Sequence, residues 1–432
     1  MMQLEDGQVR RAERAVLVGL NADTLRREEI ATDASLEELE ALLETAGGFC
    51  TAKILQNRHA PESRTFIGQG KAEEVRMLIE ATESTMAIFD NALSPSQIRV
   101  LEEVLGVPVL DRSALILDIF AQRARTAEGR LQVELAQYQY LLPRLSGMGK
   151  SLSRQGGGIG TRGPGETQLE TDRRHIRSRI ARLQEELEQV RQVRSVQRRQ
   201  RQKNSVPVAA LVGYTNAGKS TVLNALTGAG IPANNRLFDT LDTTSRRLWV
   251  SDTLEVIVSD TVGFIAKLPH HLVDAFRATL EELRYADVLI HVIDSSDPER
   301  QAHVQVVEQL LQQLADPETP VISCYNKADL VTPEELPVGE NCIAISAKNG
   351  RNLDGLLALM ERNLNRGRHR GVFCIPYAQG GLLERLHQQG QVAKVEYTPE
   401  GILVEATVGP MLYGQLRTYR TDPPAQSEPG EG

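Results

Sequence analysis

The stretch VPVAALVGYTNAGKSTVLNAL, residues 206–226, decides how the centre of this chain folds. The apolar run before Gly213 predicts a strand, and the residues from Lys219 onward have the pattern of a helix. Between them Gly213, Gly218, Lys219 and Ser220 have the spacing G-x-x-x-x-G-K-S. Backbone N–H groups of such a turn can surround phosphate oxygens at a helix N-terminus. The stretch therefore predicts a strand–loop–helix unit that binds phosphates.

The lysine and the serine of this loop each have an expected role in binding the nucleotide. We expect Lys219 to reach the β- and γ-phosphates of a nucleotide and the Ser220 hydroxyl to bind Mg²⁺. The residues of the loop predicted to bind the nucleotide are Gly213, Tyr214, Thr215, Asn216, Ala217, Gly218, Lys219 and Ser220.

The base that this nucleotide carries is indicated by YNKADL, which follows the apolar run PVISC. Asn326-Lys327-x-Asp329 resembles the guanine-specificity motif of GTPases. The Asp329 carboxylate can accept hydrogen bonds from the ring N–H and the exocyclic amine of guanine, and a base without these donors would leave it unpaired. In ISAKNG, Ser346-Ala347-Lys348 resembles the loop behind the guanine ring. GTP and GDP are the expected ligands.

Two further segments have the pattern of nucleotide switches. In LFDTLDTTSRR, residues 237–247, Thr240 resembles the first-switch threonine that reaches Mg²⁺ when the γ-phosphate is present. The strand LEVIVSDTVGF ends in Asp260-x-x-Gly263, where Asp260 would hold Mg²⁺ through water and the Gly263 N–H would contact the γ-phosphate. The nucleotide contacts predicted in these two segments are Phe238, Asp239, Thr240, Leu241, Asp242, Asp260, Thr261, Val262 and Gly263. Lys219, Thr240 and Gly263 are the predicted catalytic residues, and Ser220, Thr240 and Asp260 the predicted Mg²⁺ ligands.

Two residues refine the expected mechanism. Many GTPases carry a glutamine after this glycine to orient the attacking water, but here the residue is Phe264. Because phenylalanine cannot orient water, we expect hydrolysis by the protein alone to be slow and a partner to complete the site. Asn216 resembles the loop asparagine of GTPases that bind K⁺ beside the phosphates, where the cation neutralises charge.

Charge is unevenly distributed along the 432 residues. Residues 120–203 carry 18 lysines and arginines against 8 aspartates and glutamates, in a chain of net charge −8. Such a basic segment favours a polyanionic partner, most commonly nucleic acid, although a solvated helix face would have the same composition.

The four cysteines form no C-x-x-C pair, and no run approaches the ~20 apolar residues of a membrane span. We expect a cytoplasmic monomer without membrane insertion.

The basic segment has the pattern of a helical hairpin. Leu131, Leu135, Tyr138 and Leu142 form one apolar stripe, and a second contains Ile176, Ile180, Leu183, Leu187 and Val190. The stretch between them, residues 146–166, holds eight glycines. Its G-x-G-x-x-G spacing at 158–163 follows no strand, which argues against a dinucleotide-binding turn. The residues predicted to bind RNA are Lys150, Arg154, Arg162, Arg173 and Arg174, with a disordered linker as the alternative.

The remaining sequence completes an α/β multidomain prediction. The predicted parts are an N-terminal parallel α/β domain (1–111), a protruding antiparallel helical hairpin (112–203), a P-loop GTPase domain (204–368), a small C-terminal α+β domain (369–420) and a disordered tail (421–432). In the first part, Ser35 and Glu38 have capping-box spacing. Gly68, Gly70 and Lys71 precede a helix, which indicates either a plain turn or an anion site that could hold ATP.

Taken together, the motifs resemble the HflX family of ribosome-associated GTPases. The matching stretches are GYTNAGKST, FDTLDTTSRR, DTVGFIAKLPHHLVDAFRATLEEL, NKAD, SAK, GQGKAEEV and GGGIGTRGPGETQLETDRR, although many members have proline after the aspartate of LDTT. The resemblance implies binding to the large ribosomal subunit and its rRNA, with the hairpin loop entering the peptidyl-transferase region, and splitting of stalled ribosomes under stress. Two alternatives stay open: an RNA-remodelling enzyme with a second, ATP-binding site, and a nucleotide-gated module that docks another protein.

Overall fold

The computed structural model describes residues 13–145, 164–203, 206–228, 237–238, 244–252, 254–268, 283–365 and 369–421. The chain divides into two compact units. One is made of residues 1–190, 234–242 and 263–278, and the other of residues 191–233, 243–262 and 279–432.

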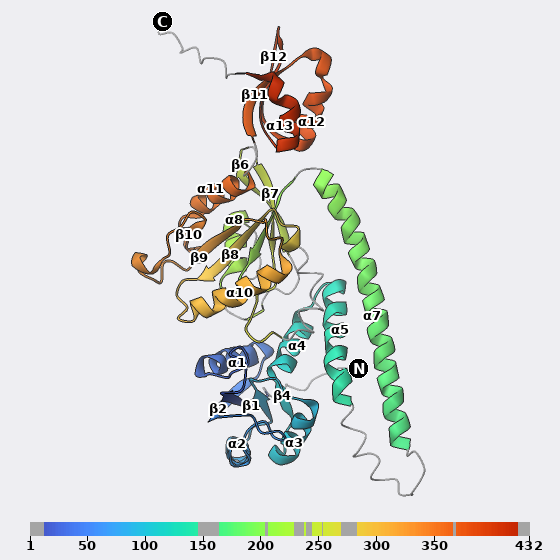
Figure 1. Ribbon diagram of the computed structural model, residues 1–432. Helices are drawn as coiled ribbons and strands as arrows, with labels where there is room; N and C mark the ends of the chain where they lie inside the picture. The colour runs from blue at the N-terminus through green and yellow to red at the C-terminus, as the bar shows by residue number, and fades with distance from the viewer. Residues whose placement is uncertain are drawn as a thin grey trace. The chain divides into compact units, whose positions relative to one another are not determined.

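The first unit begins with a four-stranded parallel sheet in the order β2-β1-β3-β4 (Figure 1). Its strands are β1 Arg14–Ala22, β2 Phe49–Arg58, β3 Met86–Phe89 and β4 Val109–Asp111. The helices that alternate with them are α1 Asp33–Ala46, α2 Gln69–Thr82, α3 Pro95–Leu105 and α4 Arg112–Arg123. The run of residues 15–20 is buried because β1 lies inside the sheet between β2 and β3. The parallel α/β architecture predicted for this part of the chain is confirmed.

The start of α1 differs from the prediction. Thr32, not Ser35, is the N-cap: its hydroxyl accepts the Ser35 N–H at 3.1 Å, and the Ser35 hydroxyl accepts the Thr32 N–H at 2.8 Å. The capping box predicted for Ser35 and Glu38 is therefore wrong by one turn. The helix begins at Asp33, so Glu38 lies inside it and pairs with Arg112 instead.

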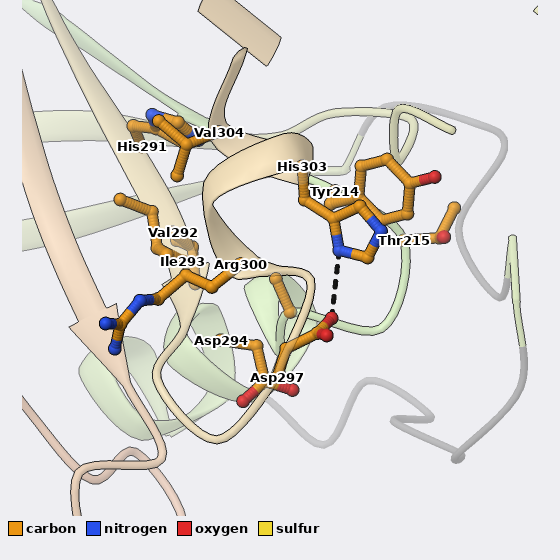
Figure 2. Close-up of a pocket in the computed structure, with 11 residues that line it drawn as sticks. Tyr214, Thr215, His291, Val292, Ile293, Asp294, Asp297, Arg300, His303 and Val304 are labelled. Carbon is orange, nitrogen blue, oxygen red and sulfur yellow. Dashed lines mark ion pairs between the residues drawn. The ribbon is translucent and has the colours of Figure 1, made fainter. Parts of the chain in front are cut away.

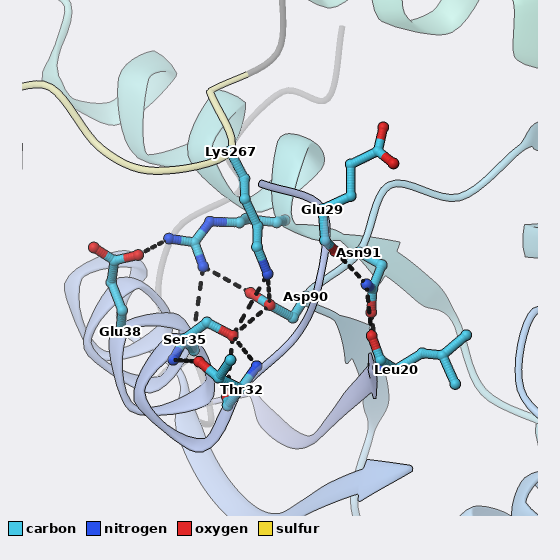
Figure 3. Close-up of polar contacts among 9 residues, drawn as sticks. Leu20, Glu29, Thr32, Ser35, Glu38, Asp90, Asn91 and Lys267 are labelled. Atoms are coloured by element: carbon cyan, nitrogen blue, oxygen red, sulfur yellow. Dashed lines mark hydrogen bonds and ion pairs between the residues drawn. The ribbon is translucent and has the colours of Figure 1, made fainter. Parts of the chain in front are cut away.

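A cluster of buried charges lies at the carboxyl ends of β3 and β4 (Figure 3). The carboxylate of Asp90 accepts hydrogen bonds from Arg112 at 2.7 Å and from the Ser35 hydroxyl at 2.7 Å, and pairs with Lys267. Burial by itself would raise the pKa of Asp90, but the charges of Arg112 and Lys267 outweigh it and lower that pKa. Each of these buried charges has an opposite partner, and removing one partner would leave a costly uncompensated charge.

Two long helices complete the first unit and lie side by side in Figure 1. They are α5 Ala127–Arg144 and α7 Pro164–Lys203, the second of which continues into the other unit. Their contact buries Leu135, Leu183 and Leu187, with Leu131, Tyr138 and Ile180 packed around them. Arg179 on α7 also forms a two-pronged ion pair with Glu134 on α5. The two predicted apolar stripes therefore meet.

The second unit contains a six-stranded sheet in the order β10-β9-β8-β5-β7-β6, in which only β6 runs antiparallel to its neighbour. Its strands are β5 Val208–Val212, β6 Thr244–Ser251, β7 Leu254–Asp260, β8 Val288–Asp294, β9 Val321–Asn326 and β10 Cys342–Ala344. Its helices are α8 Lys219–Thr227, α10 Arg300–Leu314, α11 Leu353–Leu364 and the short 3₁₀ turn η3 Pro333–Glu335. The near-continuous apolar runs of β5 and β8 are buried because helices cover a parallel sheet on both faces.

The same unit ends in a small antiparallel sheet in the order β12-β13-β11-β14. Its strands are β11 His369–Ile375, β12 Gly390–Thr398, β13 Gly401–Val408 and β14 Arg420–Thr421. Its helical segments are η4 Tyr377–Gln379, α12 Gly381–Gln389, α13 Pro410–Leu416 and η5 Arg417–Tyr419. The predicted α+β composition is confirmed, whereas the predicted tail beyond residue 421 lies outside the described residues. Within the part of the chain that the structure describes, no helix is long and apolar enough to cross a membrane.

Candidate functional site

The phosphate loop lies between the central strand β5 and the helix α8. Gly213 has φ 153°, and a Cβ atom on it would lie 2.2 Å from the carbonyl oxygen of Val292 in β8. Gly218 has φ 94°, and a Cβ atom there would lie 2.3 Å from Nδ2 of Asn326. Both positions favour glycine, because a Cβ atom would collide with the Val292 backbone in one case and the Asn326 side chain in the other, and would strain the backbone in both.

Lys219 is the first residue of α8 and is buried inside this loop. Its Nζ donates hydrogen bonds to the carbonyl oxygens of Gly213 at 3.1 Å and Tyr214 at 2.8 Å. Burial lowers the pKa of Lys219 to about 8, an effect that the nearby Asp260 carboxylate partly offsets. A buried ammonium group of this kind gains strongly from an anion, which is the role that the sequence assigned to it.

Two of the predicted Mg²⁺ ligands meet directly. The Ser220 hydroxyl donates a hydrogen bond to Oδ2 of Asp260 at 2.7 Å, and Asp260 is fully buried at the end of β7. These oxygen donors fit Mg²⁺, which takes one or two protein ligands and completes its shell with phosphate oxygens and water. No group of three or more His, Cys, Asp or Glu side chains suited to a metal occurs among the described residues. Bound at this position, Mg²⁺ would neutralise phosphate charge.

The residues predicted to recognise guanine surround Asn326 at the end of β9. This buried side chain donates to the carbonyl oxygen of Ala217 at 3.0 Å and accepts the N–H of Ala347 at 3.1 Å. It therefore ties the phosphate loop to the loop of residues 346–348. A hydrogen bond from Ser346 lowers the pKa of Asp329. The exposed Asp329 carboxylate is thus a charged acceptor, as guanine recognition requires.

Other residues predicted to contact the nucleotide pack against or bond to protein groups. The Thr261 hydroxyl donates to the carbonyl oxygen of Leu211 at 2.7 Å, and Val262 is buried. Phe238, in the first unit, is 3% exposed and meets the ring of Phe120 edge-on, with centroids 4.7 Å apart. Phe264 is buried as well. Lys327 pairs with Asp294 at 2.6 Å, and Lys348 is exposed.

Several predicted site residues lie outside the described part of the chain. These are Asp239, Thr240, Leu241 and Asp242 of the first switch, together with Lys150, Arg154 and Arg162 of the glycine-rich stretch. Of the RNA-binding candidates on α7, Arg174 is exposed and Arg173 half-buried.

The candidate anion site of the N-terminal sheet has local contacts of its own. The N–H of Gly68 donates to Oε1 of Gln56 at 2.9 Å, and Lys71 pairs with Glu74 on the same helix at 2.6 Å. These contacts favour the plain turn and helix start, because the N–H at the helix cap and the lysine charge each have a protein partner.

A pocket beside the phosphate loop contains residues that the sequence analysis missed (Figure 2). Its wall combines Tyr214 and Thr215 with residues from β8, the loop after it and the start of α10: His291, Asp294, Asp297, Arg300 and His303. The only local signal was the polar stretch DSSDPERQAH directly after an apolar run. Such stretches are common at strand ends, so nothing in that spacing separates these residues from an ordinary loop.

The central strand, phosphate loop, carboxylate and guanine-recognition loops define a P-loop GTPase domain. Comparison with known sequences agrees, because residues 208–327 match the family described as 50S ribosome-binding GTPase. Residues 33–121 and 123–201 match the families of the GTP-binding GTPase N-terminal and middle regions.

Whole-chain relatives identify the family. The chain is 48% identical to a GTPase HflX of Caldanaerobacter subterraneus over 408 residues, 94% of each chain. It is 44% identical to the GTPase HflX of Escherichia coli K12 over 83% of this chain and 86% of the relative. The chain belongs to the GTPase HflX family, and its reaction is hydrolysis of GTP. A GTP-binding protein of Sulfolobus solfataricus, solved with GDP, aligns over 82% of this chain and 99% of its own, with 24% identity and a TM-score of 0.44.

Proposed function

We propose that this GTPase binds the large ribosomal subunit and dissociates stalled ribosomes under stress. The observation that carries the proposal is the match of residues 208–327 to a family described as 50S ribosome-binding GTPase. The basic segment supports it, since residues 120–203 carry 18 lysines and arginines against 8 acidic residues. On α7, Arg174, Arg177 and Arg182 are exposed and so accessible to phosphate groups of rRNA.

Slow hydrolysis by the protein alone is part of this proposal. With Phe264 buried after Gly263, the chain presents no side chain at this position that could orient water. The ribosome would supply or position the missing group. Energy for dissociation would come from the different affinities of the GTP and GDP forms for the subunit.

GTP turnover with and without large ribosomal subunits tests the proposal. Stimulation on the order of 10²-fold or more is expected if the subunit completes the transition-state contacts. A variant with residues 146–166 replaced by a Gly-Ser linker of equal length should keep basal turnover and lose stimulation. Arg370→Gln, which changes an exposed arginine of the C-terminal sheet, serves as the control. Unstimulated turnover of the wild-type protein would contradict the proposal.

We also infer that K⁺ binds beside the phosphates at Asn216. This residue is exposed in the loop with φ 61°, between the buried Thr215 and Ala217, so its side-chain oxygen is accessible to a cation. A K⁺ ion there would neutralise charge that develops during hydrolysis. Turnover should fall when Na⁺ replaces K⁺, and Asn216→Ala should lose that difference. An unchanged wild-type rate in Na⁺ would overturn this inference.

A further inference from the structure

A histidine of α10 stacks on the phosphate loop. The imidazole of His303 and the phenol ring of Tyr214 lie face to face, with centroids 3.7 Å apart and planes 10° from parallel (Figure 2). Tyr214 is the second residue of the loop and is only 7% exposed. The stack therefore connects a rigid helix to the loop that receives the phosphates.

The imidazole is itself held in place. Its Nδ1 lies 2.9 Å from Oδ2 of Asp297, the ion pair drawn in Figure 2. The hydrogen bond with His303 lowers the pKa of Asp297, and the other carboxylate oxygen accepts the Glu299 N–H at 2.9 Å. Asp297 is thus a charged, fixed partner that orients the His303 ring.

The backbone of Tyr214 determines the shape of the loop. Its carbonyl oxygen accepts hydrogen bonds from Nζ of Lys219 at 2.8 Å and from the Ala217 N–H at 3.3 Å. One residue earlier, the backbone of Gly213 is so close to Val292 that no Cβ atom would fit. Packing against the strand therefore fixes Gly213, and the aromatic stack restricts the next residue.

We propose that His303 is a positioning residue for GTP: with Asp297 it holds Tyr214 so that the phosphate loop is preformed for the phosphates. The proposal rests on the GTPase activity of the family and not on the proposed ribosomal function. His303 acts through Tyr214 and touches no phosphate itself. Preforming the loop strengthens binding of GTP, its transition state and GDP alike, because less ordering remains to be done on binding.

This role has a specific kinetic signature. His303→Ala should raise the dissociation constant for a fluorescent GDP and the KM for GTP by about 3- to 10-fold, the range of an aromatic stacking interaction. The kcat at saturating GTP should stay within about 2-fold, because uniform binding energy is removed while the chemical step is unchanged. His303→Phe keeps an aromatic ring against Tyr214 and should restore most of the affinity.

The C-terminal sheet offers a matched control. There His369 at the start of β11 stacks on Tyr413 of α13, with centroids 3.9 Å apart and planes 21° from parallel. His369→Ala therefore removes a similar stack and should leave the KM and the GDP affinity unchanged. All measurements use the full chain. Binding of GDP by the wild-type protein is the test of the GTPase assignment, so failure of that assignment can be distinguished from failure of this proposal.

Three results would overturn the proposal: unchanged GDP affinity in His303→Ala, equal reductions of that affinity in His303→Ala and His369→Ala, or a fall in kcat at constant KM. Should His303→Ala not fold, Tyr214→Leu and Tyr214→Phe test the same stack from the other side. Tyr214→Leu should weaken GDP binding more than Tyr214→Phe, which keeps an aromatic ring against His303. Equal affinities of these two variants would also overturn the proposal.

Discussion

Among single residues, burial shifts the pKa values of two basic groups around the phosphate loop. Lys219 and His291 are 6% and 3% exposed, respectively. Burial, together with the charge of Lys219, lowers the pKa of His291 to about 4. His291 is therefore neutral near pH 7, and Lys219 is the cation available to a phosphate.

His291 should make folding sensitive to acid. Its pKa is about 4 in the folded chain against 6.5 for the free side chain, so between these values the unfolded state binds more protons. Stability then rises with pH across this window, and acid removes up to about 3 kcal/mol as the pH falls through it. His291→Gln should lose less free energy of unfolding between pH 7 and pH 4.5 than the wild-type chain, measured by urea unfolding. The exposed His387→Gln is the control, and an equal loss in both variants would contradict the prediction.

Among the helices, the packing of α5 on α7 shows how a largely polar helix is held. Most of α7 is charged or polar, so few of its side chains can contribute apolar burial. Leu183 and Leu187 are buried against Leu135 on α5, and Ile180 packs beside them. Arg179 on α7 also forms an ion pair with Glu134 on α5. The position of α7 on α5 thus depends on a small number of side chains.

Truncation of one leucine should release this helix pair. Leu183 is fully buried, and Leu183→Ala should cost about 2–5 kcal/mol, because apolar burial is removed and a cavity remains. Hydrogen exchange in α5 should accelerate and the urea midpoint of the first unfolding transition should fall. The neighbouring exposed Gln184→Ala should change neither, and similar effects of both substitutions would show that this packing contributes little stability.

On the scale of the whole molecule, charge is divided between an acidic chain and one basic segment. The net charge is −8 although residues 120–203 are strongly basic. A partner rich in phosphate would be attracted to this segment and repelled by the acidic remainder of the chain. The charge distribution therefore directs such a partner to residues 120–203.

Binding to large ribosomal subunits should therefore weaken steeply with salt, because lysines and arginines that bind phosphate groups release counterions. Arg174→Gln and Arg177→Gln change two exposed positions of α7, and the slope of log affinity against log salt should fall by about 1 for each phosphate group that a variant no longer binds. Arg370→Gln should keep the wild-type slope. An affinity independent of salt would instead favour docking onto a protein surface.

The sequence by itself predicted the phosphate loop, the guanine motif, the N-terminal parallel sheet and the two apolar stripes, because each depends on residue types at a short spacing. Gly213 and Gly218, for example, have positive φ angles that favour glycine, and close contacts with Val292 and Asn326 in the folded chain add to that requirement. The predicted N-cap of α1 was wrong by one turn. Thr32 and Ser35 are both residue types that suit an N-cap, and the local pattern does not distinguish between them.

Only the tertiary structure decided which distant side chains meet. Asn326 joins two loops, His303 stacks on Tyr214, and Lys267 pairs with Asp90, each across a sequence separation that no spacing rule covers. The physical reason is that these interactions depend on the packing of strands and helices against one another, and not on the backbone preferences of the residues themselves. The chemistry of the site is therefore determined locally, whereas the support that holds it is a property of the folded chain.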